Sequence, residues 1–287
     1  MKPVLFTIGK FAVHGYGFMI AIGVIIAYFV AEFRAKRLGL QPDKIFALTI
    51  TCLLGGFLGA KILYYIVEIK SIIKDPSILL DIGDGFVVYG GIITGILSGY
   101  IYCRIRKLNF LDYFDLVMPE IALAQAFGRL GCFMAGCCYG CESHAAWGLH
   151  FPAESVAPSG VALVPIQLIS AFLNFANFFA LCYLAKKCKN KGQIASLYLL
   201  FYAVGRFVVE FWRGDVVRGS VGALSTSQFI SIFIFLAGLL LIAYFTFKQR
   251  VDDYVIGKWK KIFCKKAAYS NSESGDCSYD NTKDKNK

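Results

Sequence analysis

The sequence contains seven apolar stretches, each close to the roughly 20 helical residues that are needed to cross the hydrocarbon core of a bilayer. Only 17% of all residues are charged, against about 25% in soluble domains. The pattern therefore predicts an all-α integral membrane protein with seven transmembrane helices and excludes a soluble globular domain. The stretches are Tyr16–Phe33, Ile45–Ile66, Phe86–Cys103, Tyr113–Met134, Pro165–Ala185, Gln193–Trp212 and Gln228–Phe247.

The basic residues predict how these helices are oriented. Of the 30 Lys and Arg residues, 21 lie in segments 34–44, 104–112, 186–192 and 248–287. The positive-inside rule places these segments in the cytoplasm and the N-terminus outside. We therefore expect a membrane domain at 1–247, followed at 248–287 by a basic juxtamembrane segment and a disordered cytoplasmic tail. The net charge of +11 then reflects topology, and no nucleic-acid partner is expected.

Ionisable residues inside the apolar stretches are candidate functional groups, because they are costly in a bilayer. Tyr202, Arg206, Glu210 and Arg213 recur at spacings that put them on one face of a helix. Arg129, in the outer half of the fourth stretch, adds a positive charge at about the same depth. A structural Arg206–Glu210 ion pair is one interpretation. The surplus positive charge instead favours an anionic, phosphate-bearing lipid, since the arginine fork pairs well with phosphate.

Two glycines at the start of the third stretch suit the same kind of ligand. Gly90 and Gly91 follow Tyr89, and a helix beginning there would direct free N–H groups and its positive dipole end at an anion. Glycines in membrane helices also allow close helix packing, which is the better explanation for those at 55–59.

A group of cysteines follows Arg129, and it admits three interpretations. Cys138 and Cys141, with His144, have spacings that suit a soft metal ion. A pair of thiols facing an oxidising exterior can instead form a disulfide. Buried thiols can also simply pack as small apolar groups. Cys132 and Cys137 belong to the same group.

Two longer motifs resemble those of the bacterial prolipoprotein diacylglyceryl transferase family, and the resemblance extends to about Gly238. In the first motif, Arg129 takes the place of the family's essential arginine and Gly140 that of its closing glycine. The second motif matches at every key position, and Tyr16 resembles the family's first tyrosine. The motifs are Gly128-Arg-Leu-Gly-Cys-Phe-Met-Ala-Gly-Cys-Cys-Tyr-Gly140 and Tyr202-x3-Arg206-Phe-x2-Glu210-x2-Arg213-x-Asp215.

The chain departs from the family pattern at several positions, one of them a stretch that is reduced here to Val164-Pro-Ile-Gln-Leu-Ile-Ser170. Tyr89 stands where the family has a histidine, Cys132 where it has an asparagine and Cys137 where it has a glutamate. Because the cysteine group lies inside the family motif, we favour packing or a disulfide for it, and we expect no metal ion and no cofactor.

The resemblance implies a transferase of the bacterial plasma membrane, expected to be a monomer. It would move the diacylglyceryl group of phosphatidylglycerol to the lipobox cysteine of preprolipoproteins, whose signal peptides it would bind in the bilayer, as the first step of lipoprotein maturation. Arg129, Arg206 and Tyr89 are the implied catalytic residues, with His14 as a second candidate base. The substrate-binding residues would be Tyr16, Gly90, Gly91, Gly140, Tyr202, Glu210 and Arg213.

Two other functions are compatible with the same residues. A non-catalytic homologue would bind an anionic lipid or a signal peptide without releasing glycerol phosphate. A cysteine-based redox or metal-handling membrane protein would depend on Cys137, Cys138 and Cys141 and would tolerate loss of Arg129.

Overall fold

The computed structural model describes residues 4–8, 11–80, 83, 85–143, 147–153, 155–188, 190–214, 219–222 and 224–270. It contains two compact units, Met1–Ile242 and Ala243–Lys287. The first unit holds all of the site residues discussed below. Helix α8 (Thr226–Ser270) begins in the first unit and supplies the helical part of the second.

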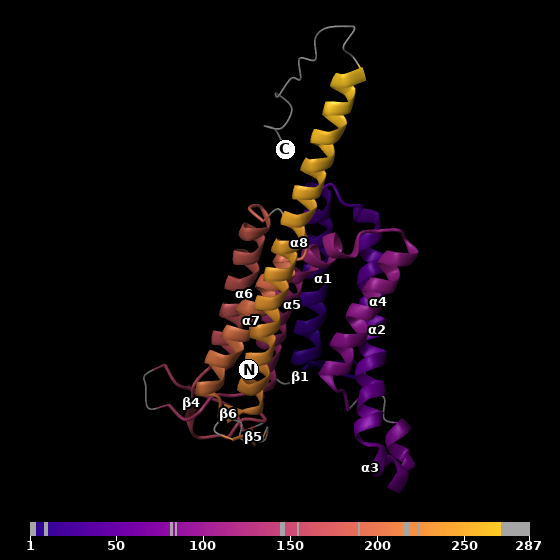
Figure 1. The fold of residues 1–287 in the computed structure, drawn as a ribbon. Coiled ribbons are helices and arrows are strands. Elements are labelled where there is room, and N and C mark those ends of the chain that lie inside the picture. The colour runs from indigo at the N-terminus through magenta and orange to yellow at the C-terminus, as the bar shows by residue number, and fades with distance from the viewer. Residues whose placement is uncertain are drawn as a thin grey trace. The chain divides into compact units, whose positions relative to one another are not determined.

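The first unit is built from long helices (Figure 1). Three short antiparallel ribbons accompany them, pairing β1 with β2, β3 with β4 and β5 with β6. The long helices are α1 (Gly15–Arg37), α2 (Ile45–Val67), α4 (Val88–Ile105), α5 (Phe110–Ala135), α6 (Ile166–Ala185) and α7 (Gln193–Val209). The short helices are η1 (Pro42–Lys44), α3 (Ile69–Lys74), η2 (Pro76–Leu80) and η3 (Glu210–Trp212). The strands are β1 (Val4–Ile8), β2 (Phe11–His14), β3 (Leu149–His150), β4 (Ala162–Leu163), β5 (Ser220–Val221) and β6 (Leu224–Ser225).

Within the described residues, six helices are long and apolar enough to cross a membrane. The protein is thus a mostly α-helical, multi-pass membrane protein, and the three short β-ribbons are an addition to the predicted all-α fold. The third predicted stretch forms α4, which has 18 residues and is not among the six. Its three tyrosines, four glycines and one arginine reduce its apolar character, so a seventh span stays a prediction. The six spans are Gly15–Arg37, Pro42–Val67, Phe110–Ala135, Ile166–Ala185, Gln193–Trp212 and Thr226–Val251.

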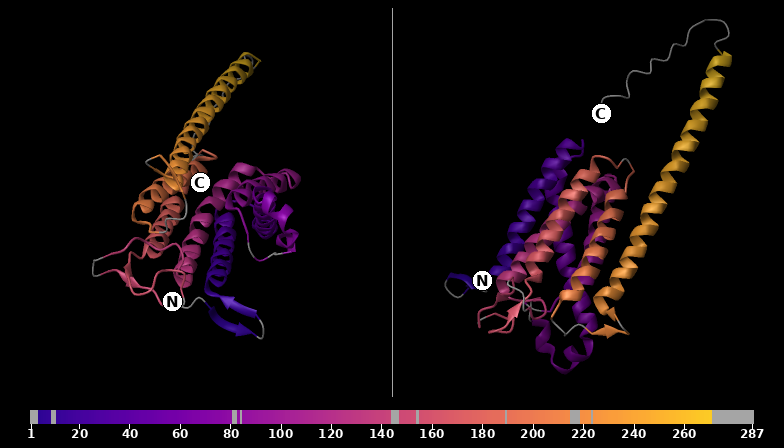
Figure 2. Two further views of the ribbon diagram at one scale, coloured as in Figure 1. Left: turned by 90° about the horizontal axis from the view of Figure 1, so that it is seen from below. Right: turned by 90° about the vertical axis from the view of Figure 1, so that its left-hand side faces the viewer.

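Helix α5 is the central element, because α1, α6 and α7 all pack against it, while α2 and α4 pack mainly on each other (Figure 2). Glycines allow the close approach of α2 and α4. A Cβ atom on Gly90 would lie 2.3 Å from the carbonyl oxygen of Gly59. Thr94 Oγ1 on α4 donates a hydrogen bond to the Gly55 carbonyl on α2 (2.8 Å). These contacts confirm the packing interpretation of the glycines at 55–59.

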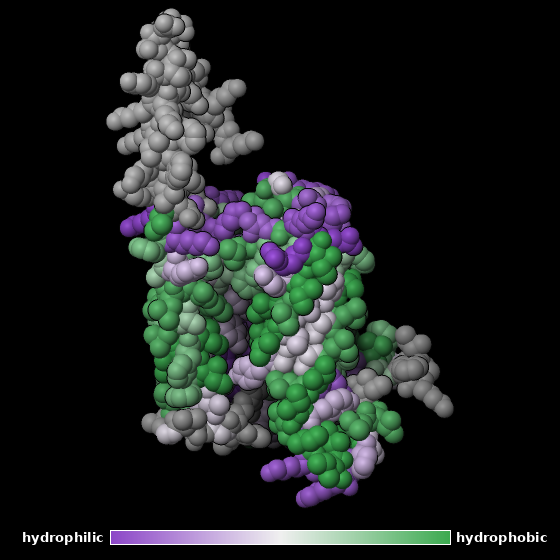
Figure 3. Space-filling view, turned by 45° about the vertical axis from the view of Figure 1, so that its right-hand side comes forward, coloured by the Kyte–Doolittle hydropathy of each residue, from purple (hydrophilic) through white to green (hydrophobic). Residues whose placement is uncertain are grey.

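Large apolar side chains cover the outside of the helices (Figure 3). Phe46, Leu54 and Ile62 of α2 are each more than half exposed, as expected for side chains that face lipid rather than water. Hydrophilic side chains gather above this apolar band in the view shown.

Two carboxylates tie α5 to its neighbours at the end opposite to the site. Glu120, which is 3% exposed, forms an ion pair with Arg34 of α1. Asp115 accepts hydrogen bonds from the backbone N–H groups of Gly192 (2.6 Å) and Ala195 (2.9 Å) at the start of α7. These contacts hold α5 and α7 in place, and the opposite ends of these two helices carry Arg129 and Arg206.

Candidate anion-binding site

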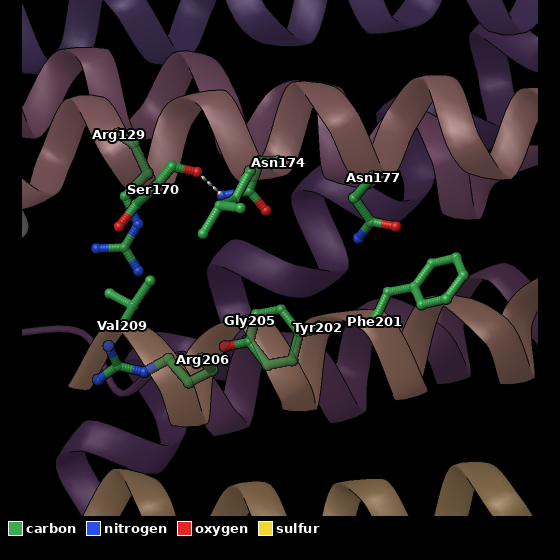
Figure 4. Close-up of a pocket in the computed structure, with 10 residues that line it drawn as sticks. Arg129, Ser170, Asn174, Asn177, Phe201, Tyr202, Gly205, Arg206 and Val209 are labelled. Atoms are coloured by element: carbon green, nitrogen blue, oxygen red, sulfur yellow. Dashed lines mark hydrogen bonds between the residues drawn. The ribbon is translucent and has the colours of Figure 1, made fainter. Parts of the chain in front are cut away.

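A partly open cavity lies between α5, α6 and α7 (Figure 4). Arginines from two different helices, Arg129 and Arg206, point into the same end of it. Polar side chains of α6 line the wall that faces α7. The lining residues are Arg129, Ser170, Leu173, Asn174, Asn177, Phe201, Tyr202, Gly205, Arg206 and Val209.

Arg206 is held by two partners. Its Nη2 atom lies 2.9 Å from Glu210 Oε2, one helical turn further on, and the two side chains are only 11% and 7% exposed. The same nitrogen donates a hydrogen bond to Ser227 Oγ at the start of α8 (2.7 Å). Ser225 Oγ in turn donates to Glu210 Oε1 (3.1 Å). The other terminal nitrogen, Nη1, is buried and has no partner among the described residues, so it can donate to a ligand.

Arg129 supplies the second positive charge of the cavity. Within the described part of the chain, no Asp or Glu lies at ion-pair distance from it. Among the described residues, Glu210, which pairs with Arg206, is thus the one carboxylate at ion-pair distance from either of the two guanidinium groups that line the cavity. Tyr202 completes the wall beside Arg206 and stacks on Tyr198, with ring centroids 6.0 Å apart. The structure therefore brings together Arg129, Tyr202, Arg206 and Glu210, as the sequence predicted.

The prediction that Arg213 shares the helical face of Arg206 is wrong, because α7 ends at Val209, η3 ends at Trp212 and Arg213 has an extended backbone. Arg213 still comes close to this group because two glycines let distant backbone segments cross. Gly140, after α5, pairs with Arg213 in an isolated antiparallel bridge. A Cβ atom on Gly140 would lie 2.5 Å from the Val164 carbonyl oxygen, and one on Gly214 would lie 2.4 Å from the Gly140 carbonyl oxygen. Gly140 therefore has a structural reason to be glycine, and its predicted contact with substrate stays a prediction.

Tyr16 lies at the start of α1, against the end of α5. A Cβ atom on Gly131 would lie 3.0 Å from the Tyr16 carbonyl oxygen, so this glycine permits the contact. The Tyr16 hydroxyl is within electrostatic range of Arg129 and of three cysteines. The structure thus joins Tyr16 to the predicted arginine site.

The cysteines of the first motif form a different group from the Cys138, Cys141 and His144 set that their spacing suggested. The Sγ atoms of Cys132, Cys137 and Cys138 all lie within 4.8 Å of one another, whereas Cys141 is exposed. His144 lies outside the described residues. Hydrogen bonds from Cys132 and Cys137, followed by the charges of Arg213 and Arg129, hold the pKa of the Cys138 thiol below its ordinary value.

The remaining predicted residues, Tyr89, Gly90, Gly91 and His14, are not among the residues that line the cavity. Tyr89 is 53% exposed in the first turn of α4, and Gly90 and Gly91 pack against backbone oxygens of α2. His14 is exposed at the end of β2. Their predicted roles in substrate binding and proton transfer stay predictions. Asp215 of the second motif is outside the described residues.

Sequence reasoning missed the polar wall of α6 and the hydroxyl that holds Arg206. Ser170, Asn174 and Asn177 line the cavity, and the Asn177 Oδ1 atom is buried without a partner among the described residues. Their spacing of i, i+4 and i+7 within an apolar stretch was the available signal. Ser227 offered no such signal, because its contact with Arg206 joins two different helices.

These features define a multi-pass helical membrane protein with an arginine-lined cavity whose charge suits an anion. The family model "Prolipoprotein diacylglyceryl transferase" matches residues 3–244, and the chain belongs to this family.

Several relatives carry the name phosphatidylglycerol–prolipoprotein diacylglyceryl transferase. The Clostridium tetani protein is 46% identical over 241 residues, 84% of this chain and 96% of the relative. The Clostridium perfringens protein, numbered 2, is 49% identical over 243 residues, 84% of this chain and 94% of the relative. A Staphylococcus aureus protein is 32% identical over 260 residues, 88% of this chain and 92% of the relative.

Proposed function

We propose that the protein transfers the diacylglyceryl group of phosphatidylglycerol to the cysteine thiol of preprolipoproteins, with glycerol phosphate as the leaving group. The relatives reported above are named for phosphatidylglycerol and prolipoprotein as the substrates of this transfer. The observation that carries the proposal for this chain is the pair Arg129 and Arg206, which point into one cavity. Among the described residues, the one carboxylate at ion-pair distance from either arginine is that of Glu210, which pairs with Arg206.

The chemistry explains why two arginines are needed. The sulfur attacks a glycerol carbon, the bond from that carbon to the phosphate oxygen breaks, and the electron pair leaves on the phosphate. Preorganised positive groups that face this growing charge are commonly the largest contribution to catalysis. Glu210 and Ser227 hold Arg206 in position, so little reorganisation is needed when the charge develops.

The other predicted residues complete the site in this proposal. Arg213 and Tyr16 contact the headgroup from the outer side, and Tyr202 supports the Arg206 wall. Tyr89 and the first turn of α4 at Gly90 and Gly91 hydrogen-bond the headgroup before it enters the cavity. The Gly140 backbone contacts the substrate beside Arg213.

The topology completes the proposal. The basic segments between helices support an N-terminus outside and a C-terminus in the cytoplasm of the bacterial plasma membrane, with α4 as a seventh span. Residues 1–247 form the transferase domain, and 248–287 form a basic juxtamembrane segment with a cytoplasmic tail. The chain acts as a monomer that receives its lipid and the signal peptide from the bilayer.

Complementation tests the proposed function. A bacterial strain depleted of its own transferase is supplied with the full chain or with Arg206→Ala, and lipidation of its lipoproteins is followed by metabolic labelling with a fatty acid. The wild-type chain is expected to restore labelling, and Arg206→Ala is not. Failure of the wild-type chain, when it is present in the membrane, would contradict the proposal.

A further inference from the structure

Three sulfur atoms meet beside the arginine site. The Sγ atoms of Cys132, Cys137 and Cys138 lie within 4.8 Å of one another, and none of the three is in a disulfide. Zn–S bonds of about 2.3 Å at tetrahedral angles put sulfurs about 3.8 Å apart. Small side-chain rotations therefore suffice to bring all three sulfurs onto one ion.

The backbone that carries these thiols is fixed from two helices. Gly136 ends α5 in the left-handed conformation (φ 70°), and Cys138 also has a positive φ of 57°. These turns fold the chain back, so that the Cys137 N–H bonds to the Cys132 carbonyl (3.1 Å). Gln167 of α6, which is 1% exposed, donates a hydrogen bond from Nε2 to the Cys137 carbonyl (2.9 Å).

The charges around the three thiols suit a bound divalent cation. Three thiolates and one zinc ion carry a net charge of −1. Arg129 and Arg213 lie within electrostatic range of Cys138, and Tyr16 is within range of all three thiols. A metal-bound cluster here is thus offset by positive charge, and it would adjoin the cavity in which the phosphate is expected.

We propose that Cys132, Cys137 and Cys138 bind one zinc ion as thiolates and leave a fourth coordination position for the substrate. The substrate that takes this position is the cysteine thiol of the preprolipoprotein, an assignment that rests on the proposed function. A coordinating thiol is deprotonated outright, so its proton passes to water and its sulfur stays nucleophilic. After attack on the glycerol carbon, the product is a thioether, which is a weaker ligand than a thiolate and leaves the ion. The proposal departs from the sequence-based expectation of no metal.

Metal content tests the site itself. The full chain is purified in detergent, loaded with zinc and desalted, and its zinc is measured by mass spectrometry. We expect about one zinc ion per wild-type chain and at least about 100-fold weaker binding for Cys137→Ser. Cys182→Ser, a partly buried thiol on α6, is the matched control and is expected to bind like the wild type. A wild-type chain that retains no zinc would overturn the proposal.

A cobalt-substituted chain tests the fourth position. Tetrahedral Co²⁺ bound by thiolates has visible absorption bands that change when a ligand is added. We expect a change on adding a lipobox-like peptide with cysteine and none with the matching serine peptide. A spectrum that both peptides leave unchanged would overturn coordination of the substrate thiol.

One comparison separates this proposal from the proposed function. Zinc-free protein, stripped with a chelator and verified by metal analysis, is assayed for glycerol phosphate release from phosphatidylglycerol. We expect a loss of at least about tenfold that added zinc restores. Full activity without zinc would overturn the role of the metal and leave the transferase function standing. Zinc and cysteine-peptide binding without any glycerol phosphate release would overturn the transferase function and leave the metal site standing.

Discussion

Removing one hydroxyl should weaken catalysis by a predictable amount. Ser227 Oγ accepts a hydrogen bond from Arg206 Nη2 (2.7 Å), and a hydrogen bond to a charged group is worth about 1.5–3 kcal/mol. Glu210 contacts the same nitrogen at 2.9 Å and still holds it in Ser227→Ala. We therefore take the lower end of the range, which corresponds to about a tenfold lower rate because 1.36 kcal/mol is a factor of ten.

The assay measures diacylglyceryl transfer from phosphatidylglycerol vesicles to a lipobox peptide by the purified full chain. Ser231→Ala is the matched control, because Ser231 lies one turn further along α8 and its hydroxyl donates only to the Ser227 carbonyl among the described contacts. Ser227→Thr keeps the hydroxyl and should recover most of the rate. If Ser227→Ala works within twofold of the wild type, the contact does not orient Arg206 for catalysis.

Three further substitutions test the packing that supports the site. Gly140→Ala places a Cβ against backbone oxygens and should lower transfer at least about fivefold through a cost of about 1–3 kcal/mol. Gly128→Ala, whose Cβ has no neighbour within 4 Å, should leave transfer unchanged, and equal rates for the two variants would be inconsistent with this packing. Arg34→Met leaves Glu120 buried without its cation and should lower the free energy of unfolding by about 3–5 kcal/mol. The expected result is a lower melting temperature in detergent, which the second change Glu120→Leu should restore. Gly90→Ala, whose Cβ would be 2.3 Å from a backbone oxygen of α2, should also lower the melting temperature, and an unchanged value would argue against close α2–α4 packing.

The sequence predicts the parts of this protein that depend on local spacing. Apolar length locates the long helices, and the i, i+4, i+8 pattern of Tyr202, Arg206 and Glu210 places these side chains on one face, because both signals follow from helix geometry. The cavity confirms that this face is shared with Arg129. These predictions need no knowledge of which helices are neighbours.

The remaining features depend on contacts between segments that are far apart in the chain. The crossing of Gly140 and Gly214 brings Arg213 beside the first motif, and no local pattern encodes it. The three-thiol cluster depends on the left-handed end of α5 at Gly136, which turns Cys137 back toward Cys132. The spacing rule for metal ligands points to Cys138 and Cys141 instead, because it takes no account of the left-handed turn at Gly136.

The most direct test of the anion site is a parallel measurement of glycerol phosphate release and peptide lipidation by the wild-type chain and Arg206→Lys. Lysine keeps the charge but lacks the planar fork that donates two hydrogen bonds to one phosphate. We predict one glycerol phosphate per lipidated peptide for the wild type, and a rate at least about 100-fold lower for Arg206→Lys. Lipidation without glycerol phosphate release, or an unchanged rate in Arg206→Lys, would contradict the account.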